Sequence, residues 1–192
     1  KMIIDFPDQD FIGGGEESFG YMVGDFVRDK DAVTSALLAC EIAAAAKAGG
    51  SSFYDTLLEL YTKHSFYKER LVSFTKKGMD GAEQIKQIMI DLRKNPLTHI
   101  DGSKVTFVND YEASTEMNMS TGEEKIMELP KSNVLIYHTE DGTKVAARPS
   151  GTEPKIKFYF SVQSPLYTVE NAIKKEQELD TKIDRIITEM AI

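Results

Sequence analysis

Two hydrophobic patterns, one of period two and one of helical period, divide the second half of the chain into elements. Apolar and polar side chains alternate along residues 156–162 (IKFYFSV), as in a strand with one buried face. Further strands are predicted for residues 67–75, 102–110, 133–139 and 143–148. Apolar residues at helical spacing predict helices over residues 82–95 and 168–190. This content favours an α+β domain from about residue 66, with an antiparallel sheet covered by helices on one face.

The two predicted helices are amphipathic, and the segment between the strands is not. The apolar stripe of the first helix contains Ile85, Ile88, Met89 and Leu92. The stripe of the second contains Val169, Ile173, Ile183, Ile186, Ile187 and Met190. We expect both stripes to pack on the sheet. Residues 111–128 are polar and have no period, which predicts a mobile loop.

The first third of the chain predicts two helices. Residues 32–48 (AVTSALLACEIAAAAKA) are apolar on most helical faces, with Asp31 as the N-cap and Gly49-Gly50 as the end. We therefore expect a buried helix, in which Cys40 is a small core residue. Ser52 and Asp55 resemble a capping box at the start of a second, short helix that would bridge two units.

Charge and composition narrow the possible functions. The chain has 31 acidic and 23 basic residues, a net charge of -8, which disfavours nucleic acid as a partner. No apolar run approaches the ~20 residues that span a bilayer, and no signal peptide is recognisable. A single cysteine fits a reducing compartment. We expect a cytoplasmic protein without a membrane partner, and the start at Lys1 in a polar stretch suggests a piece of a longer chain.

The segment RPSGTEP, between two predicted strands, has the chemistry of an anion site. Arg148 offers a rigid fork that matches two phosphate oxygens, and Ser150 and Thr152 offer hydroxyl donors. Gly151 would let the backbone turn sharply, so that successive N–H groups converge on one anion. Lys157 would add a second positive charge. The alternative is a plain turn between strands that uses proline and glycine.

Two stretches in the first third carry candidate groups for a polyhydroxyl ligand. In GGGEESFGY, Glu16 and Glu17 would repel a pyrophosphate but would accept hydrogen bonds from sugar hydroxyls, and Ser18 can donate or accept. In VRDKDAV, Lys30 could point towards a substrate. The alternatives are solvated glutamates beside a structural glycine turn, and a self-paired cluster of surface charges.

Taken together, GGGEESFGY, VRDKDAV and ARPSGTEPKIKFYF resemble the C-terminal part of an α-D-phosphohexomutase of the phosphoglucomutase/phosphomannomutase type. DYEAS and LPKSNVLIYHTEDGTKVA follow in the expected order, so the resemblance covers nearly the whole chain. The long run ending in KFYF is closest to the bacterial branch that includes phosphoglucomutase and phosphopentomutase-like members. One departure is Phe26, where related sequences often have histidine.

The resemblance implies a role for each matching residue. Glu16 and Ser18 would contact sugar hydroxyls, and Lys30 would lie near the substrate. The phosphate group that is not transferred would be bound by Arg148, Ser150, Gly151, Thr152 and Lys157. Such a mutase moves a phosphoryl group between two sugar positions through a bisphosphorylated intermediate. Glucose, mannose and pentose phosphates all remain candidate substrates.

The resemblance also implies the domain organisation and what the sequence lacks. Residues 1–50 would end an α/β sugar-binding third domain, residues 51–65 a linker helix, and residues 66–192 a complete α+β fourth domain. The sequence contains neither the phosphoserine motif nor the aspartate-rich metal loop. Catalytic residues and Mg²⁺ would belong to earlier domains of the parent, and this chain alone would be inactive. A free-standing, non-catalytic phosphosugar-binding module is the alternative, and residues 32–48 could mediate self-association.

Overall fold

The computed structural model describes residues 8–16, 19–76 and 80–190. The chain divides into two compact units, the first ending at Glu59 and the second beginning at Leu60. This division falls inside helix α3 (Phe53–His64).

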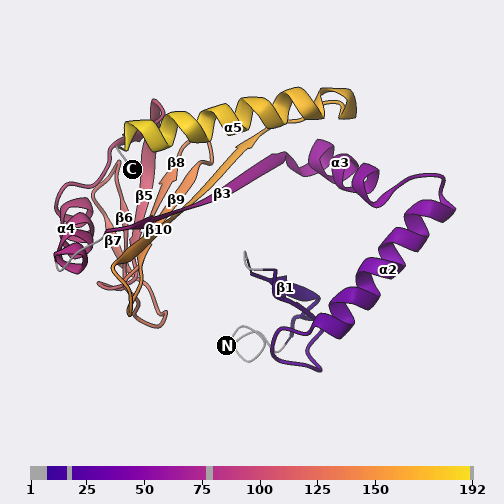
Figure 1. Ribbon diagram of the computed structural model, residues 1–192, viewed down its shortest axis with the longest axis horizontal. Coiled ribbons are helices and arrows are strands. Elements are labelled where there is room, and N and C mark those ends of the chain that lie inside the picture. Colours follow the sequence, from indigo (N-terminus) through magenta and orange to yellow (C-terminus); the bar gives the residue numbers. More distant parts are fainter. Residues whose placement is uncertain (1–7, 17–18, 77–79, 191–192) are drawn as a thin grey trace. The chain divides into compact units, whose positions relative to one another are not determined.

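The first unit contains a small hairpin and a long helix, drawn in indigo in Figure 1. Strands β1 (Gly13–Gly15) and β2 (Tyr21–Val23) pair antiparallel. Helix α2 (Ala32–Ala48) has the predicted bounds: the Asp31 carboxylate accepts from the Val33 N–H at 3.0 Å, and Gly49 follows as the C-cap. The capping box before α3 is also confirmed, since the Ser52 N–H donates to the Asp55 carboxylate at 3.0 Å.

The expected burial of α2 is wrong for this chain. None of its residues is buried, Leu37 is 60% exposed, and Cys40 is exposed rather than in a core. A helix of 17 residues needs a broad apolar surface to cover it. The part of the first unit that the structure describes offers only the two short strands of the hairpin.

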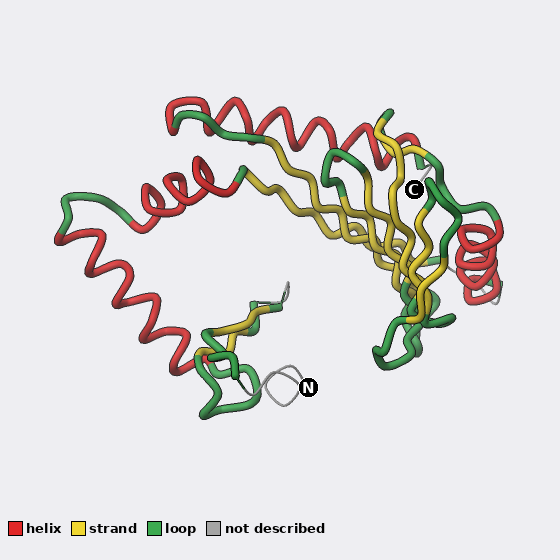
Figure 2. The backbone as a smooth tube through the Cα atoms, turned by 180° about the vertical axis from the view of Figure 1, so that it is seen from behind, coloured by secondary structure: helices red, strands yellow, loops and turns green. Residues whose placement is uncertain are grey.

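The second unit is built on one antiparallel sheet, seen as the yellow strands in Figure 2. The strand order is β3-β10-β9-β8-β5-β6-β7, and β4 pairs with β5 at one side. The strand bounds are β3 (Phe66–Thr75), β4 (His99–Ile100), β5 (Ser103–Asp110), β6 (Thr115–Asn118), β7 (Glu124–Ile126), β8 (Leu135–Thr139), β9 (Lys144–Pro149) and β10 (Lys155–Ser164). The predicted antiparallel sheet is therefore confirmed.

One face of this sheet packs against α4 (Gly81–Lys94) and α5 (Ala172–Glu189), the latter preceded by a 3₁₀ turn, Val169–Asn171. The alternation in β10 is confirmed: Ile156, Phe158, Phe160 and Val162 are at most 2% exposed. Helix α5 contacts β3 and β10, and α4 contacts β9 and β10. Figure 1 shows α5 lying along the sheet.

The apolar stripe of α5 differs from the predicted one at its start. The buried positions are Ala172, Leu179, Ile183 and Ile186, whereas Ile173 is 70% exposed and Val169 lies in the 3₁₀ turn. The buried residues follow steps of seven, four and three, the spacing of one helix face. Ile173 is one residue, and so about 100°, away from that face.

The loop predicted over residues 111–128 is also wrong, because it contains the hairpin β6–β7. Strand β6 pairs with β5 from Phe107↔Asn118 to Asp110↔Thr115, which extends the sheet at its edge. The Asn118 carbonyl accepts from the N–H of Gly122 at 2.8 Å, and Gly122 has φ 73°. Most side chains of these short strands are polar. Those of β6 are all half-buried and those of β7 are all exposed, so no alternation marks either strand.

Candidate functional site

The loop between β9 and β10 is closed by its own backbone and hydroxyl groups. The Ser150 N–H donates to the carbonyl of Lys155 at 2.7 Å. The Ser150 hydroxyl oxygen accepts from the N–H groups of Thr152 at 3.4 Å and Glu153 at 3.3 Å. The carbonyl of Pro154 accepts from the Lys76 N–H at 2.9 Å, which ties the loop to the end of β3. Two of the amides expected to converge on an anion therefore point at the Ser150 hydroxyl in this structure.

The backbone at Gly151 differs from the sharp turn that was expected there. Its φ lies outside the left-handed region, so the turn does not require a glycine for its dihedral angles. A Cβ added at Gly151 would have no heavy atom within 4 Å. The glycine thus leaves bare backbone facing open space, where a ligand can approach.

Basic side chains gather where β9 and β10 meet this loop. Arg148 and Lys157 are direct cross-strand partners. Lys155 lies two residues before Lys157, on the same face of β10, away from α4 and α5. Sequence reasoning missed Lys155, although its period-two spacing from Lys157 is a signal for it. We call these three residues the basic cluster.

The basic cluster differs from the basic residues of β3 in lacking acidic partners among the described residues. Lys68 and Arg70 on β3 pair with α5 residues Glu176, Asp180 and Asp184. Among the residues that the structure describes, none of the basic cluster forms an ion pair with a carboxylate. Like charges directly across a strand pair destabilise a sheet unless an anion neutralises them.

The hairpin of the first unit brings together two of the residues predicted to bind sugar. The Glu16 N–H donates to the Gly20 carbonyl at 2.8 Å, which closes the turn between β1 and β2. The Glu16 carboxylate and the Lys30 ammonium form an ion pair at 3.3 Å, with both side chains about half exposed. Ser18 lies outside the described residues.

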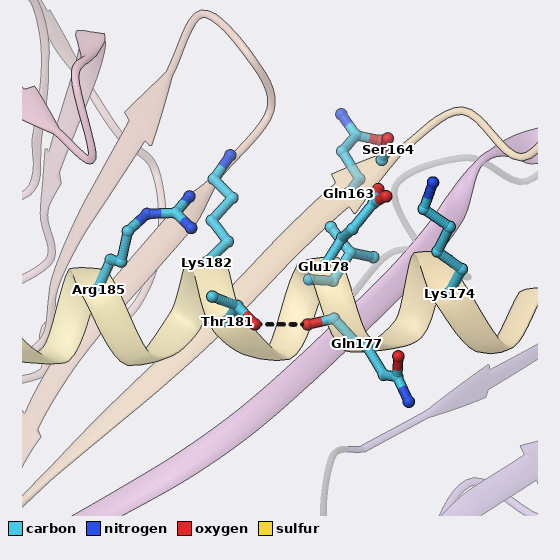
Figure 3. A pocket seen from close by; sticks show the side chains of 9 residues that line it. Gln163, Ser164, Lys174, Gln177, Glu178, Thr181, Lys182 and Arg185 are labelled. Carbon is cyan, nitrogen blue, oxygen red and sulfur yellow. Dashed lines mark hydrogen bonds between the residues drawn. The ribbon is translucent and has the colours of Figure 1, made fainter.

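The large groove of the second unit lies elsewhere, along α5. Its volume is about 620 Å³, and Figure 3 shows side chains of α5 and of Gln163 and Ser164, at the end of β10, around it. Lys182 is bound to Asp141, and Arg185 forms two hydrogen bonds of 2.7 Å with Asp101. Because carboxylates neutralise these two cations, they fasten α5 to the sheet and do not form an anion site.

In residues 8–16, 19–76 and 80–190, no three His, Cys, Asp or Glu side chains are grouped so that they could hold a metal ion. No single helix of the described chain has the length and apolar character to span a membrane; α2 and α3 meet that test only as a pair bent by 90°.

The known proteins that this chain resembles are phosphoglucomutases in sequence and in fold. Residues 3–63 match the family model of phosphoglucomutase/phosphomannomutase, alpha/beta/alpha domain III. Phosphoglucomutase of Staphylococcus epidermidis is 36% identical over 163 residues, which cover 85% of this chain and 30% of that protein. Phosphoglucomutase of Staphylococcus aureus is 38% identical over 157 residues, covering 82% and 28%. The chain thus spans about 30% of the length of the curated relatives it matches.

A solved structure agrees at the level of the fold. The exocytosis-sensitive phosphoprotein pp63/parafusin of Paramecium, a phosphoglucomutase in an open form, has a TM-score of 0.57 and 16% identity. The match covers 96% of this chain and 32% of that protein. The chain is thus similar to phosphoglucomutases over a part of their length, and residues 3–63 carry the match to domain III of the phosphoglucomutase/phosphomannomutase family.

Proposed function

We propose that this chain is the substrate-recognition part of a phosphosugar mutase. The β9–β10 loop and the basic cluster bind the phosphate group that is not being transferred. Glu16, Ser18 and Lys30 bind the sugar hydroxyls. The observation that carries this proposal is the cross-strand pair Arg148–Lys157, which has no acidic partner in the described part of the chain.

The electrostatics of the basic cluster favour a phosphate dianion. The whole chain has a net charge of -8, so a local concentration of positive charge needs a specific reason. A dianion between Arg148 and Lys157 replaces a repulsion with two attractions. The guanidinium can bind two phosphate oxygens in parallel, and the open space above Gly151 leaves room for the third.

In the reaction class that the family name describes, this chain binds and orients rather than transfers. A bisphosphorylated sugar intermediate has to present each end in turn to the transferring group. The basic cluster would hold whichever phosphate is distal, and the hairpin would hold the sugar in either orientation. Charge stabilisation of the transferred phosphoryl group would come from Mg²⁺, which we place in other domains of the parent. The described residues do not form a site for that ion. We expect the isolated chain to be inactive.

The first test is the binding of inorganic phosphate and glucose 1-phosphate to the chain, measured by calorimetry. Loss of a hydrogen bond to a charged group costs about 1.5–3 kcal/mol. Arg148→Ala should therefore lower the affinity of the chain for both ligands about tenfold or more. In the full-length protein the same change should lower kcat/KM for glucose 1-phosphate at least about tenfold.

Arg185→Ala is the matched control, because this arginine lines the α5 groove and is paired with Asp101. It should lower stability but leave phosphate affinity unchanged. Phosphate binding that survives Arg148→Ala and is lost in Arg185→Ala would move the anion site to the α5 groove and overturn the proposal.

A further inference from the structure

Gly20, in the turn of the β1–β2 hairpin, lies directly beneath the side chain of Lys30. A Cβ placed on Gly20 would be 2.2 Å from Cδ and 2.7 Å from Cγ of Lys30. It would also be 3.2 Å from the carboxylate oxygen of Glu16 that pairs with Lys30. Non-bonded carbon atoms prefer separations of about 3.5–4.0 Å. With Lys30 in this place, only glycine fits at position 20.

The backbone of Gly20 gives no other reason for a glycine. Its φ lies outside the left-handed region, which in this turn is occupied by Phe19, with φ 64°. An alanine at position 20 is therefore compatible with the hairpin itself. The alanine Cβ would instead clash with the methylene groups of the Lys30 side chain.

The backbone of Lys30 cannot move aside easily. Its N–H donates to the Asp29 carboxylate at 2.7 Å. The next N–H, that of Asp31, donates to the Tyr21 carbonyl of β2 at 2.8 Å, and the Asp31 side chain caps α2. Strand β2 and the first turn of α2 thus fix the position of the Lys30 backbone. A methyl group on Gly20 would be accommodated by a change in the Lys30 rotamer, which takes the ammonium away from Glu16.

We propose that Gly20 is a positioning residue: it lets Lys30 lie across the hairpin so that its ammonium and the Glu16 carboxylate form one recognition unit for the sugar. The carboxylate accepts from a sugar hydroxyl while the ammonium donates to a neighbouring oxygen. This inference rests on the proposed sugar-binding role of Glu16 and Lys30. It adds that the geometry of the pair depends on the missing side chain at position 20.

A double-mutant cycle in the full-length protein tests this, with kcat/KM for glucose 1-phosphate as the readout. Gly20→Ala should lower kcat/KM about tenfold, the effect of losing one hydrogen bond to a charged group. In a Lys30→Ala background the same change should have no further effect, because the clash is gone. Gly14→Ala is the matched control: its Cβ would meet only Phe11, at 3.4 Å, and kcat/KM should stay within about twofold.

Melting temperatures guard against a folding defect. If Gly20→Ala lowers the melting temperature, adding Lys30→Ala should restore it, since the obstructing side chain is removed. A crystal structure of the Gly20→Ala chain should show the Lys30–Glu16 distance increased from 3.3 Å.

The outcomes separate this inference from the proposed function. If kcat/KM falls in Lys30→Ala but is unchanged in Gly20→Ala, the inference is overturned and the proposed function is not. A Gly20→Ala loss of equal size with and without Lys30 would also overturn it, because the glycine would then act through another contact. Unchanged kcat/KM in Lys30→Ala would refute the sugar role of Lys30 and the inference together.

Discussion

Asp141, in the turn between β8 and β9, connects the sheet to α5 through its carboxylate. This carboxylate accepts from the Thr139 hydroxyl at 2.6 Å and the Thr143 N–H at 3.1 Å, and it forms an ion pair with Lys182. Burial by itself raises the pKa of Asp141, but the bonds from Lys182, Thr139 and Thr143 outweigh it and hold the pKa far below its ordinary value. The charged form is therefore favoured in the folded state.

The depressed pKa of Asp141 predicts a pH-dependent contribution to stability. A carboxyl group with a lowered folded pKa stabilises the fold above its unfolded pKa of about 3.9, and this contribution is lost as the pH falls through the folded pKa. Asp141→Asn should lower the free energy of unfolding by about 1 kcal/mol near neutral pH, a modest value because solvent screens the partly exposed pair. Urea denaturation of both proteins across the acidic range would show the difference shrinking below about pH 4. A difference that stays constant with pH would contradict the ionic role.

At the same scale, the sequence offers candidate site residues, and the structure adds the contacts between them. Arg148 and Lys157 follow from a loop next to an alternating strand, and the register makes them partners. Glu16 and Lys30 are fourteen positions apart, and only the hairpin and the start of α2 bring them together. Position 20 has room only for glycine because the Lys30 side chain lies against it. No local pattern encodes it.

At the scale of elements, the predictable helices and strands are those whose periodic pattern runs over many residues and whose one face is fully buried. Strand β10 has ten residues and one buried face, so its alternation identified both the element and its core residues. Strands β6 and β7 have four and three residues with mostly polar side chains. They exist because β5 offers backbone partners to β6, and β6 in turn offers them to β7. The inward face of α5 depends on where the helix begins, and the 3₁₀ turn before Ala172 shifts that start.

The corrected stripe of α5 predicts a contrast between two isoleucines of the same helix. Ile183 is 0% exposed and Ile173 is 70% exposed. Ile183→Ala should lower the free energy of unfolding by about 2–5 kcal/mol, because it leaves a cavity against the sheet. Ile173→Ala should change it by no more than about 0.5 kcal/mol, as is usual for a surface position. Denaturant titrations of the two variants compare them directly. Equal losses would show that the N-terminal turn of α5 packs as the sequence pattern had indicated.

At the scale of the whole molecule, the two units differ in how far they bury their own apolar residues. The second unit has a continuous core between its sheet and helices α4 and α5. Helix α2 of the first unit buries none of its residues, and its exposed apolar side chains are Val33, Leu37, Leu38 and Ile42. Contiguous apolar surface of this kind promotes association with other apolar surfaces. The family model that matches residues 3–63 is described as an alpha/beta/alpha domain III.

This difference predicts how the isolated chain behaves in solution. Amides of residues 32–48 should exchange with solvent faster than those of residues 156–162 at low protein concentration, because few buried contacts oppose local opening of α2. As the concentration rises, exchange in α2 should slow, since a second copy of the chain covers the apolar surface. Hydrogen exchange over a concentration series measures both effects, and Leu37→Lys should remove the concentration dependence while leaving residues 156–162 unchanged. Exchange in α2 that is as slow as in β10 and independent of concentration would show that the first unit is stable without a partner.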